Sequence, residues 1–192
     1  EALKGIIEKV NEDIFTFTQS HDIIGEFYGQ ADKKGLGIVL TPEHITDLFV
    51  DLAEVDSEDV VLDPCTGTGR FLISAKGKTD NLVGVEFQPS MFTFAAGNLI
   101  GESKLYRGSC FEEDIVNEIK EIYKPTVGFI NPPYSQKGDK MSELDFIDNM
   151  LDMLEEGGTG IAIVPMSCAI DTKKSVVEVR ERILSKHTLE AV

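Results

Sequence analysis

The chain contains an Asn-Pro-Pro-Tyr motif, Asn131-Pro132-Pro133-Tyr134, directly after an apolar run at 126–130 that is typical of a buried strand. The side-chain carbonyl of Asn131 and the next backbone carbonyl can both accept hydrogen bonds from a planar amino group. These contacts turn the delocalised lone pair of the nitrogen toward a methyl donor. Proline restricts the loop and holds both acceptors in place before a substrate binds. The motif therefore favours methylation of an amino group, with the Tyr134 ring stacked on a base. The simpler alternative is a Pro-Pro turn.

A second candidate site is a glycine-rich turn at the end of another apolar segment, 59–63. The turn contains Asp63, Thr66, Gly67, Thr68 and Gly69. Glycines let a ligand approach the backbone, and a helix that starts after them offers free N–H groups to an anion. The spacing lacks the third glycine of a dinucleotide fingerprint and the Gly-Lys-Ser/Thr of a P-loop. The pattern disfavours NAD and FAD and excludes a P-loop.

Glu86 ends the next apolar segment, 82–86. A carboxylate at that place can accept hydrogen bonds from both hydroxyls of a ribose, as in many nucleoside-binding folds. The alternative is an exposed acid in an acidic protein, but the presence of Gly67 and Gly69 favours ribose binding. S-adenosylmethionine fits these residues, because it is a nucleoside with ribose hydroxyls and an amino-acid carboxylate but no phosphate.

The elements that position these residues are predicted to alternate between strands and helices. We expect strands at 59–63, 82–86, 104–107, 126–130 and 160–165, and a truncated sixth strand at 188–192. We expect helices at 70–75, 89–99, 113–123 and 175–186, and one that Ser142 caps and Gly157 ends. Repeated β-α units predict an α/β, doubly wound, mostly parallel sheet, which binds ligands beyond the carboxyl ends of its strands.

The N-terminal part is expected to form a segment of its own. Residues 1–28 have a helical pattern, and 29–37 form a polar loop. Thr41 suits the N-cap and Pro42 the first position of a helix with an apolar stripe. We therefore divide the chain into an N-terminal helical segment with a cofactor-covering loop, 1–40, and a catalytic domain, 41–192, that is incomplete at its C-terminus.

The composition limits the function further. The chain has 192 residues, 42% of them hydrophobic, which fits one domain, and no apolar run reaches the ~20 residues of a membrane span. The net charge of −16 repels a phosphate backbone, so another domain or subunit must hold any nucleic acid. Alternatively, the acidity only keeps the protein soluble. Three cysteines without a CxxC pair indicate a reducing, cytoplasmic location and no metal site. Because the chain has neither an initiator Met nor a signal peptide, we expect it to be a fragment of a longer protein.

Taken together, the motifs resemble the methylase core of the modification subunits of type I restriction–modification systems, which are N6-adenine DNA methyltransferases. The resemblance covers most of the chain, and the motifs keep the family's order. They are Leu40-Thr41-Pro42, with the residues before it from Gly35, then 63–71, 86–89, 131–135 and 163–165. The Leu-Thr-Pro segment is the more specific part, because Asn-Pro-Pro-Tyr also occurs in glutamine and RNA-guanine methyltransferases.

The resemblance implies a class I S-adenosylmethionine-dependent methyltransferase fold and a role for each motif. The methionine end of the cofactor would be surrounded by Leu40, Thr41, Pro42, Thr66, Gly67, Thr68 and Gly69. Asp63 would lie near the cofactor's amino group, and Glu86 would hold its ribose. The catalytic loop Asn131, Pro132, Pro133 and Tyr134 would receive a flipped adenine. Such subunits act on DNA as a pair, together with a DNA-reading specificity subunit and in some complexes a nuclease subunit.

The chain departs from the family pattern in a few places. Ser109 stands where many relatives carry an Asp that faces the cofactor's adenine. The connections after Ala75 and Ile100 are short for the family, and the last strands are missing. Two other functions are consistent with the motifs. One is methylation of a protein glutamine or an RNA base, and the other is a non-catalytic subunit that binds S-adenosylmethionine.

Overall fold

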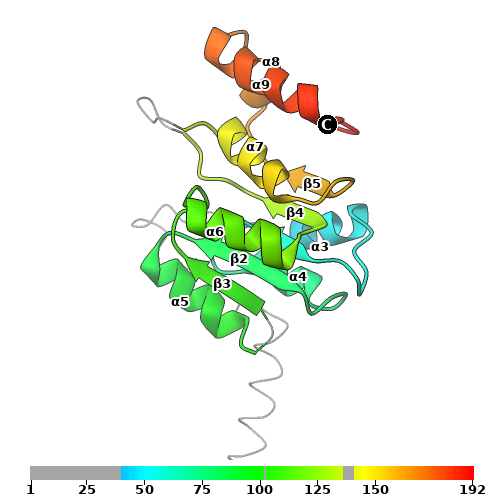
Figure 1. Ribbon diagram of the computed structural model, residues 1–192, viewed down its shortest axis with the longest axis vertical. Coiled ribbons are helices and arrows are strands. Elements are labelled where there is room, and N and C mark those ends of the chain that lie inside the picture. Colours follow the sequence, from blue (N-terminus) through cyan, green and yellow to red (C-terminus); the bar gives the residue numbers. More distant parts are fainter. Residues whose placement is uncertain (1–39, 102, 136–140) are drawn as a thin grey trace, which may run out of the picture.

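The computed structural model describes residues 40–101, 103–135 and 141–192. Five parallel strands form one sheet in the order β3-β2-β1-β4-β5 (Figure 1). The strands are β1 (Val61–Asp63), β2 (Leu82–Glu86), β3 (Ser103–Arg107), β4 (Val127–Ile130) and β5 (Thr159–Ala162). The helices are α3 (Glu43–Leu52), α4 (Arg70–Ala75), α5 (Pro89–Asn98), α6 (Glu113–Glu118), the π-helical turn η1 (Ile119–Tyr123), α7 (Glu143–Met153), α8 (Ser167–Ile170) and α9 (Lys174–Lys186). The predicted doubly wound α/β fold is confirmed.

Helices cover both faces of the sheet, so the three central strands, β2, β1 and β4, are buried on both sides. Val61 and Phe129 belong to a buried cluster with residues of α3 and α4, whereas Leu62 and Val83 belong to a second cluster with residues of η1 and α7. Figure 1 shows α6 and α7 in front of the sheet and α3 and α4 behind it. This two-sided burial explains why the sequences of these three strands are continuous apolar runs rather than alternating ones.

Three aromatic rings connect α3, α4 and β4. The ring centroids of Phe49 and Phe71 are 5.0 Å apart, and each lies 5.8 Å from the ring of Phe129. Pairs of this kind contribute about 0.5–1.5 kcal/mol beyond the burial of their area. The cluster therefore fixes the last turn of α3 and the end of β4 relative to the first turn of α4.

Helix α7 has a defined start and packs closely on β4. Ser142 and Asp145 form a capping box, in which the Ser142 backbone N–H donates to Asp145 Oδ2 at 2.8 Å. A side chain at Gly128 would meet the sulfur of Met150 at 2.9 Å, so glycine lets Met150 pack directly on β4 without a shift. On its outer side, α7 is joined to α9 by the Arg182–Asp148 ion pair, at 2.7 Å.

The sequence predictions differ from the structure mainly at element ends. The helix predicted to run to Gly157 ends at Met153, because Leu154 is extended. The predicted strand at 160–165 is β5, 159–162, and the short helix α8 after it was not predicted. The predicted strand at 188–192 is wrong, since these residues have no regular structure. The expected helix at 113–123 is α6 continued by η1.

The predicted N-terminal segment, 1–40, lies outside the described residues except for Leu40. The expectation that Thr41 caps α3 is wrong, because Pro42 is the N-cap residue and the Thr41 hydroxyl has another partner, described below. Within the described ranges, no helix combines the length and apolar character needed to cross a membrane.

Candidate active site

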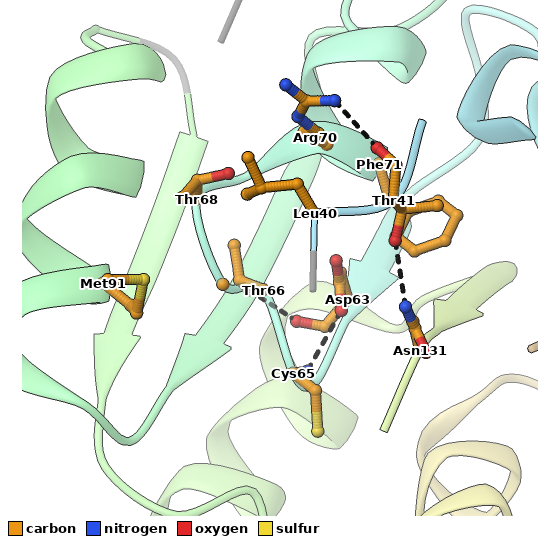
Figure 2. Close-up of a pocket in the computed structure, with 11 residues that line it drawn as sticks. Leu40, Thr41, Asp63, Cys65, Thr66, Thr68, Arg70, Phe71, Met91 and Asn131 are labelled. Carbon is orange, nitrogen blue, oxygen red and sulfur yellow. Dashed lines mark hydrogen bonds between the residues drawn. The ribbon is translucent and has the colours of Figure 1, made fainter. Parts of the chain in front are cut away.

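The candidate site lies where the direction of the strand order changes. β1 pairs with β2 on one side and with β4 on the other, and the loops after β1 and β4 both begin there. This switch point is where open α/β sheets bind ligands. A pocket of about 70 Å³ opens between the two loops (Figure 2). It is lined by Leu40, Thr41, Asp63, Cys65, Thr66, Gly67, Thr68, Arg70, Phe71, Met91 and Asn131.

The glycine-rich turn after β1 is held by backbone and side-chain hydrogen bonds. Thr66 Oγ1 donates to the Asp63 carbonyl at 2.8 Å, and the Gly69 N–H donates to the Thr66 carbonyl at 2.8 Å. Gly69 precedes α4 with φ at +97°, a conformation that favours glycine. The buried Asn98 donates from Nδ2 to the Thr68 carbonyl at 2.9 Å. The turn is thus rigid before any ligand binds.

Asp63 is almost fully buried beneath the pocket, with 1% of its surface exposed. Its Oδ1 accepts the Cys65 N–H at 3.0 Å, whereas its buried Oδ2 has no hydrogen-bond partner among the residues that the structure describes. Burial raises the pKa of Asp63 to about 8, the Cys65 N–H opposes this shift, and the charge of Glu86 adds to it. A buried carboxyl oxygen without a partner is costly, and a cationic ligand in the pocket would satisfy it.

Glu86 connects the glycine-rich turn to the end of β2. Its Oε2 accepts the Gly67 N–H at 2.8 Å, and its Oε1 accepts the Gln88 N–H at 2.6 Å. Burial raises the pKa of Glu86, and the backbone N–H groups, that of Gln88 foremost, oppose this rise. Each carboxylate oxygen has two lone-pair sites, so the side chain can hold the turn and still accept a hydroxyl.

The side chain of Asn131 points into the same pocket from the end of β4 (Figure 2). Its Nδ2 donates to Thr41 Oγ1 at 3.0 Å, and Arg70 in turn donates from Nη1 to the Thr41 carbonyl at 2.9 Å. Since the amide nitrogen is used in this contact, the amide presents Oδ1 as its acceptor. Thr41 therefore connects the glycine-rich turn to the Asn-Pro-Pro-Tyr loop.

The rest of the Asn-Pro-Pro-Tyr loop leads from the pocket toward α7. Pro132 is buried and Pro133 is exposed, while the Tyr134 ring is 48% exposed. After the motif, the Ser135 N–H and hydroxyl donate to the two carboxylate oxygens of Glu143, at 2.9 and 2.8 Å. The loop thus offers a buried start and an open aromatic ring.

A family model described as N-6 DNA Methylase matches residues 13–192. The chain belongs to this family. It is 41% identical, over 89% of its length, to a protein of Heyndrickxia coagulans named type II restriction enzyme and methyltransferase RM.BcgI. It is 28% identical, over 71% of its length, to the type I restriction enzyme HindI methylase subunit of Haemophilus influenzae. The chain spans 31% and 40% of these two proteins.

Solved structures of this family share the fold. The type I restriction-modification system methyltransferase subunit from Streptococcus thermophilus superposes with a TM-score of 0.67 at 19% identity, over 84% of this chain and 42% of that one. A modification subunit of a putative type I restriction enzyme from Vibrio vulnificus gives a TM-score of 0.70 at 17% identity, over 95% of this chain and 46% of that one. At these identities the likeness shows that the chain shares the fold of these methyltransferase and modification subunits.

In this member of the N-6 DNA Methylase family, seven of the fourteen predicted site residues line one pocket. The other seven are not part of its lining, namely Pro42, Gly69, Glu86, Ser109, Pro132, Pro133 and Tyr134. Ser109 instead closes a local turn, in which its hydroxyl accepts the Phe111 N–H at 3.2 Å. The place of Ser109 at the cofactor's adenine stays a prediction.

The lining includes four residues that the sequence analysis did not select, namely Cys65, Arg70, Phe71 and Met91. The hydrogen bond with Cys110, followed by burial, raises the pKa of the Cys65 thiol, so this side chain is a neutral part of the wall. The position of Cys65 and Arg70 inside or next to the glycine-rich turn was a usable signal. Phe71 and Met91 look like ordinary core residues of α4 and α5 in the sequence.

Proposed function

We propose that this chain is the core of a DNA methyltransferase that transfers a methyl group to N6 of adenine, with S-adenosylmethionine as the donor. One observation carries the proposal: the Asn131 amide and the unpaired carboxyl oxygen of Asp63 belong to the same pocket, on neighbouring strands. One group suits a base amino group and the other suits the cationic end of the donor. The family membership supports the same chemistry.

The chemistry of the pocket fits S-adenosylmethionine. The carboxyl group of Asp63, which lacks a partner at Oδ2, would accept from the cofactor's ammonium. The backbone of the glycine-rich turn would border its methionine end, and Glu86 would accept from its ribose. Phe87 follows Glu86 and is 71% exposed, so its ring is open to a nucleoside base. When bound, the cofactor supplies an activated methyl group on a sulfonium.

The Asn-Pro-Pro-Tyr loop would hold the target base. Asn131 Oδ1 and the Pro132 carbonyl accept the two hydrogens of the adenine amino group, which directs the nitrogen lone pair into the pocket. The exposed Tyr134 ring stacks on the extruded base. No strong general base is needed, because a nitrogen that has gained a methyl group is cationic and loses its proton to water.

The assembly follows from charge and length. The chain carries 18 basic and 34 acidic side chains, so it cannot hold a phosphate backbone well. We therefore propose that it acts as a modification subunit with a second copy and a DNA-reading specificity subunit, and in some assemblies with a nuclease. The named relatives include both type I and type II systems, so a single polypeptide that carries these parts is the alternative arrangement.

Two other functions predict different products. A methyltransferase that acts on a protein glutamine or an RNA base would use the same loop on another planar amide or amine. A non-catalytic subunit would bind S-adenosylmethionine without transfer. The position of the Asn131 amide in the cofactor pocket favours a catalytic role.

The test uses the intact protein with its DNA-reading subunit or domain, adenine-unmethylated DNA and methyl-labelled S-adenosylmethionine. We expect N6-methyladenine with the wild type and a rate roughly 100-fold lower with Asn131→Ala, since a preorganised polar group contributes about that factor. Asn117→Ala, at an exposed position of α6, is the matched control and should keep the wild-type rate. Label in protein or RNA, or no label with any variant, would contradict the proposal.

A further inference from the structure

The loop that follows β4 is held by hydrogen bonds at both ends, and those at its far end, at Ser135, lie outside the cofactor pocket. Glu143 accepts the Ser135 backbone N–H at Oε1 and the Ser135 hydroxyl at Oε2, at 2.9 and 2.8 Å. The Glu143 side chain is buried, and the residue does not line the cofactor pocket. Both contacts are hydrogen bonds to a carboxylate, which are shorter and stronger than those between neutral groups.

Glu143 is itself held in place. It is the first residue of α7, one position after the N-cap Ser142. The body of α7 lies directly on β4, where Met150 packs at Gly128. The carboxylate is therefore rigid relative to the strand from which the loop emerges.

The hydrogen bonds at Asn131 and at Ser135 lie on either side of the residues that would receive a base. At one end, Asn131 Nδ2 donates to Thr41, and at the other end Ser135 donates to Glu143. Only three residues, 132–134, lie between, and two of them are prolines. With both ends fixed, the direction of the Pro132 carbonyl and the place of the Tyr134 ring are restricted.

We propose that Glu143 is a positioning residue for the base-receiving loop, acting through Ser135 on Tyr134 and the Pro132 carbonyl. This inference rests on the proposed methyl transfer and names a residue of α7 that takes no part in the cofactor pocket. Loss of the contact would leave cofactor binding intact and lower the rate of methyl transfer.

The variants separate positioning from stability. Glu143→Ala removes both contacts, whereas Glu143→Gln keeps them, because a Gln oxygen can accept the N–H and its nitrogen can donate to the hydroxyl oxygen. Ser135→Ala removes one contact with little risk to folding. Asp145→Ala is the matched control: it removes the capping box of the same helix turn but leaves the Ser135–Glu143 contact.

We expect Glu143→Ala to lower the single-turnover rate at least tenfold, the size expected for hydrogen bonds to a charged group. We expect Glu143→Gln and Asp145→Ala to stay within about threefold of the wild type, and Ser135→Ala to fall between Gln and Ala. The dissociation constant for S-adenosylmethionine should change less than threefold in all four variants. Hydrogen exchange of the 131–135 peptide should be about tenfold faster in Glu143→Ala, faster by a smaller factor in Ser135→Ala, and unchanged in Glu143→Gln and Asp145→Ala.

Several outcomes would overturn the proposal. One is a Glu143→Ala rate within threefold of the wild type, and another is a Glu143→Gln rate as low as that of Glu143→Ala. If Asp145→Ala loses as much activity as Glu143→Ala, the role of Glu143 is only to stabilise α7. If Glu143→Ala does not fold, Ser135→Ala decides, and a wild-type rate with wild-type exchange refutes the positioning role. These results differ from a failure of the proposed function, in which the wild type itself would transfer no methyl group to DNA.

Discussion

In the protein without cofactor, the buried carboxyl group of Asp63 makes the free energy of unfolding depend on pH. Its pKa is about 8 in the folded chain and 3.8 in the unfolded chain. Below pH 4 both states hold the proton. Between pH 4 and 8 only the folded state holds it, so unfolding releases a proton and stability falls as the pH rises. The stability that the protonated carboxyl contributes is therefore present in acid and lost through pH 8.

The size of the effect follows from the proton count. One proton released on unfolding lowers the free energy of unfolding by roughly 1.4 kcal/mol per pH unit. For a chain of this length, that amounts to a decrease in Tm of about 3–6 °C per pH unit between pH 5 and 7. Other groups, Glu86 among them, contribute to the measured slope as well. The difference between the wild type and Asp63→Asn isolates Asp63, because Asn keeps the shape and the Cys65 contact but cannot ionise.

The assay is thermal unfolding of the cofactor-free protein from pH 5 to 8, for the wild type, Asp63→Asn and Asp59→Asn. Asp59 is the matched control, an acid near the start of β1 that lies outside the pocket. We expect a steeper fall of Tm with pH in the wild type and in Asp59→Asn than in Asp63→Asn. Parallel curves for all three proteins would refute the argument, since Asp63 would then have an ordinary pKa. Calorimetry at pH 7 should also show release of about one proton when S-adenosylmethionine binds the wild type.

Two further predictions concern the residues that shape the pocket. Thr41→Val removes the acceptor for Asn131 Nδ2, so we expect single-turnover methyl transfer to slow about 2- to 13-fold, the equivalent of 0.5–1.5 kcal/mol. Thr41→Ser keeps the acceptor and should keep the wild-type rate. A wild-type rate in Thr41→Val would contradict this role of Thr41. Gly69→Ala places a side chain 2.9 Å from Leu99 Cδ1 at φ +97°, so we expect a loss of about 1–3 kcal/mol in urea unfolding, whereas Gly77→Ala, with open space around it, should lose less.

Most strands and most helices were predictable from the sequence, because each of the central strands is a short apolar run followed by a turn signal. Helix α4 has the predicted bounds, and β2 has them too. The ends of α7 and β5 were not predictable in this way. Leu154 continues the apolar stripe of α7 although its backbone is extended, and Val164 continues the apolar run of β5 beyond its last paired residue. In both places hydrophobicity persists after the hydrogen bonding has ended.

The candidate site was predictable as a set of motifs but not as a set of contacts. Asp63, Gly67 and Asn131 were selected because they follow predicted parallel strands, whose carboxyl ends meet at one edge of the sheet. All three residues line one pocket. The partner of Thr41 could not be read from local sequence, since capping predicts a contact within its own helix. Glu143 looks like an ordinary acid in the first turn of a helix, and only the return of the chain after Tyr134 brings Ser135 to it.

The hydrogen bond between Asn131 and Thr41 spans ninety positions of the chain. During synthesis, the glycine-rich turn and its hydrogen bond to Glu86 can form as soon as β1 and β2 have left the ribosome. The Asn131 amide, which would receive a base, can reach Thr41 only after β4 has paired with β1. A nascent chain is thus expected to form the binding site for the methyl donor well before it forms the site for the base that accepts the methyl group.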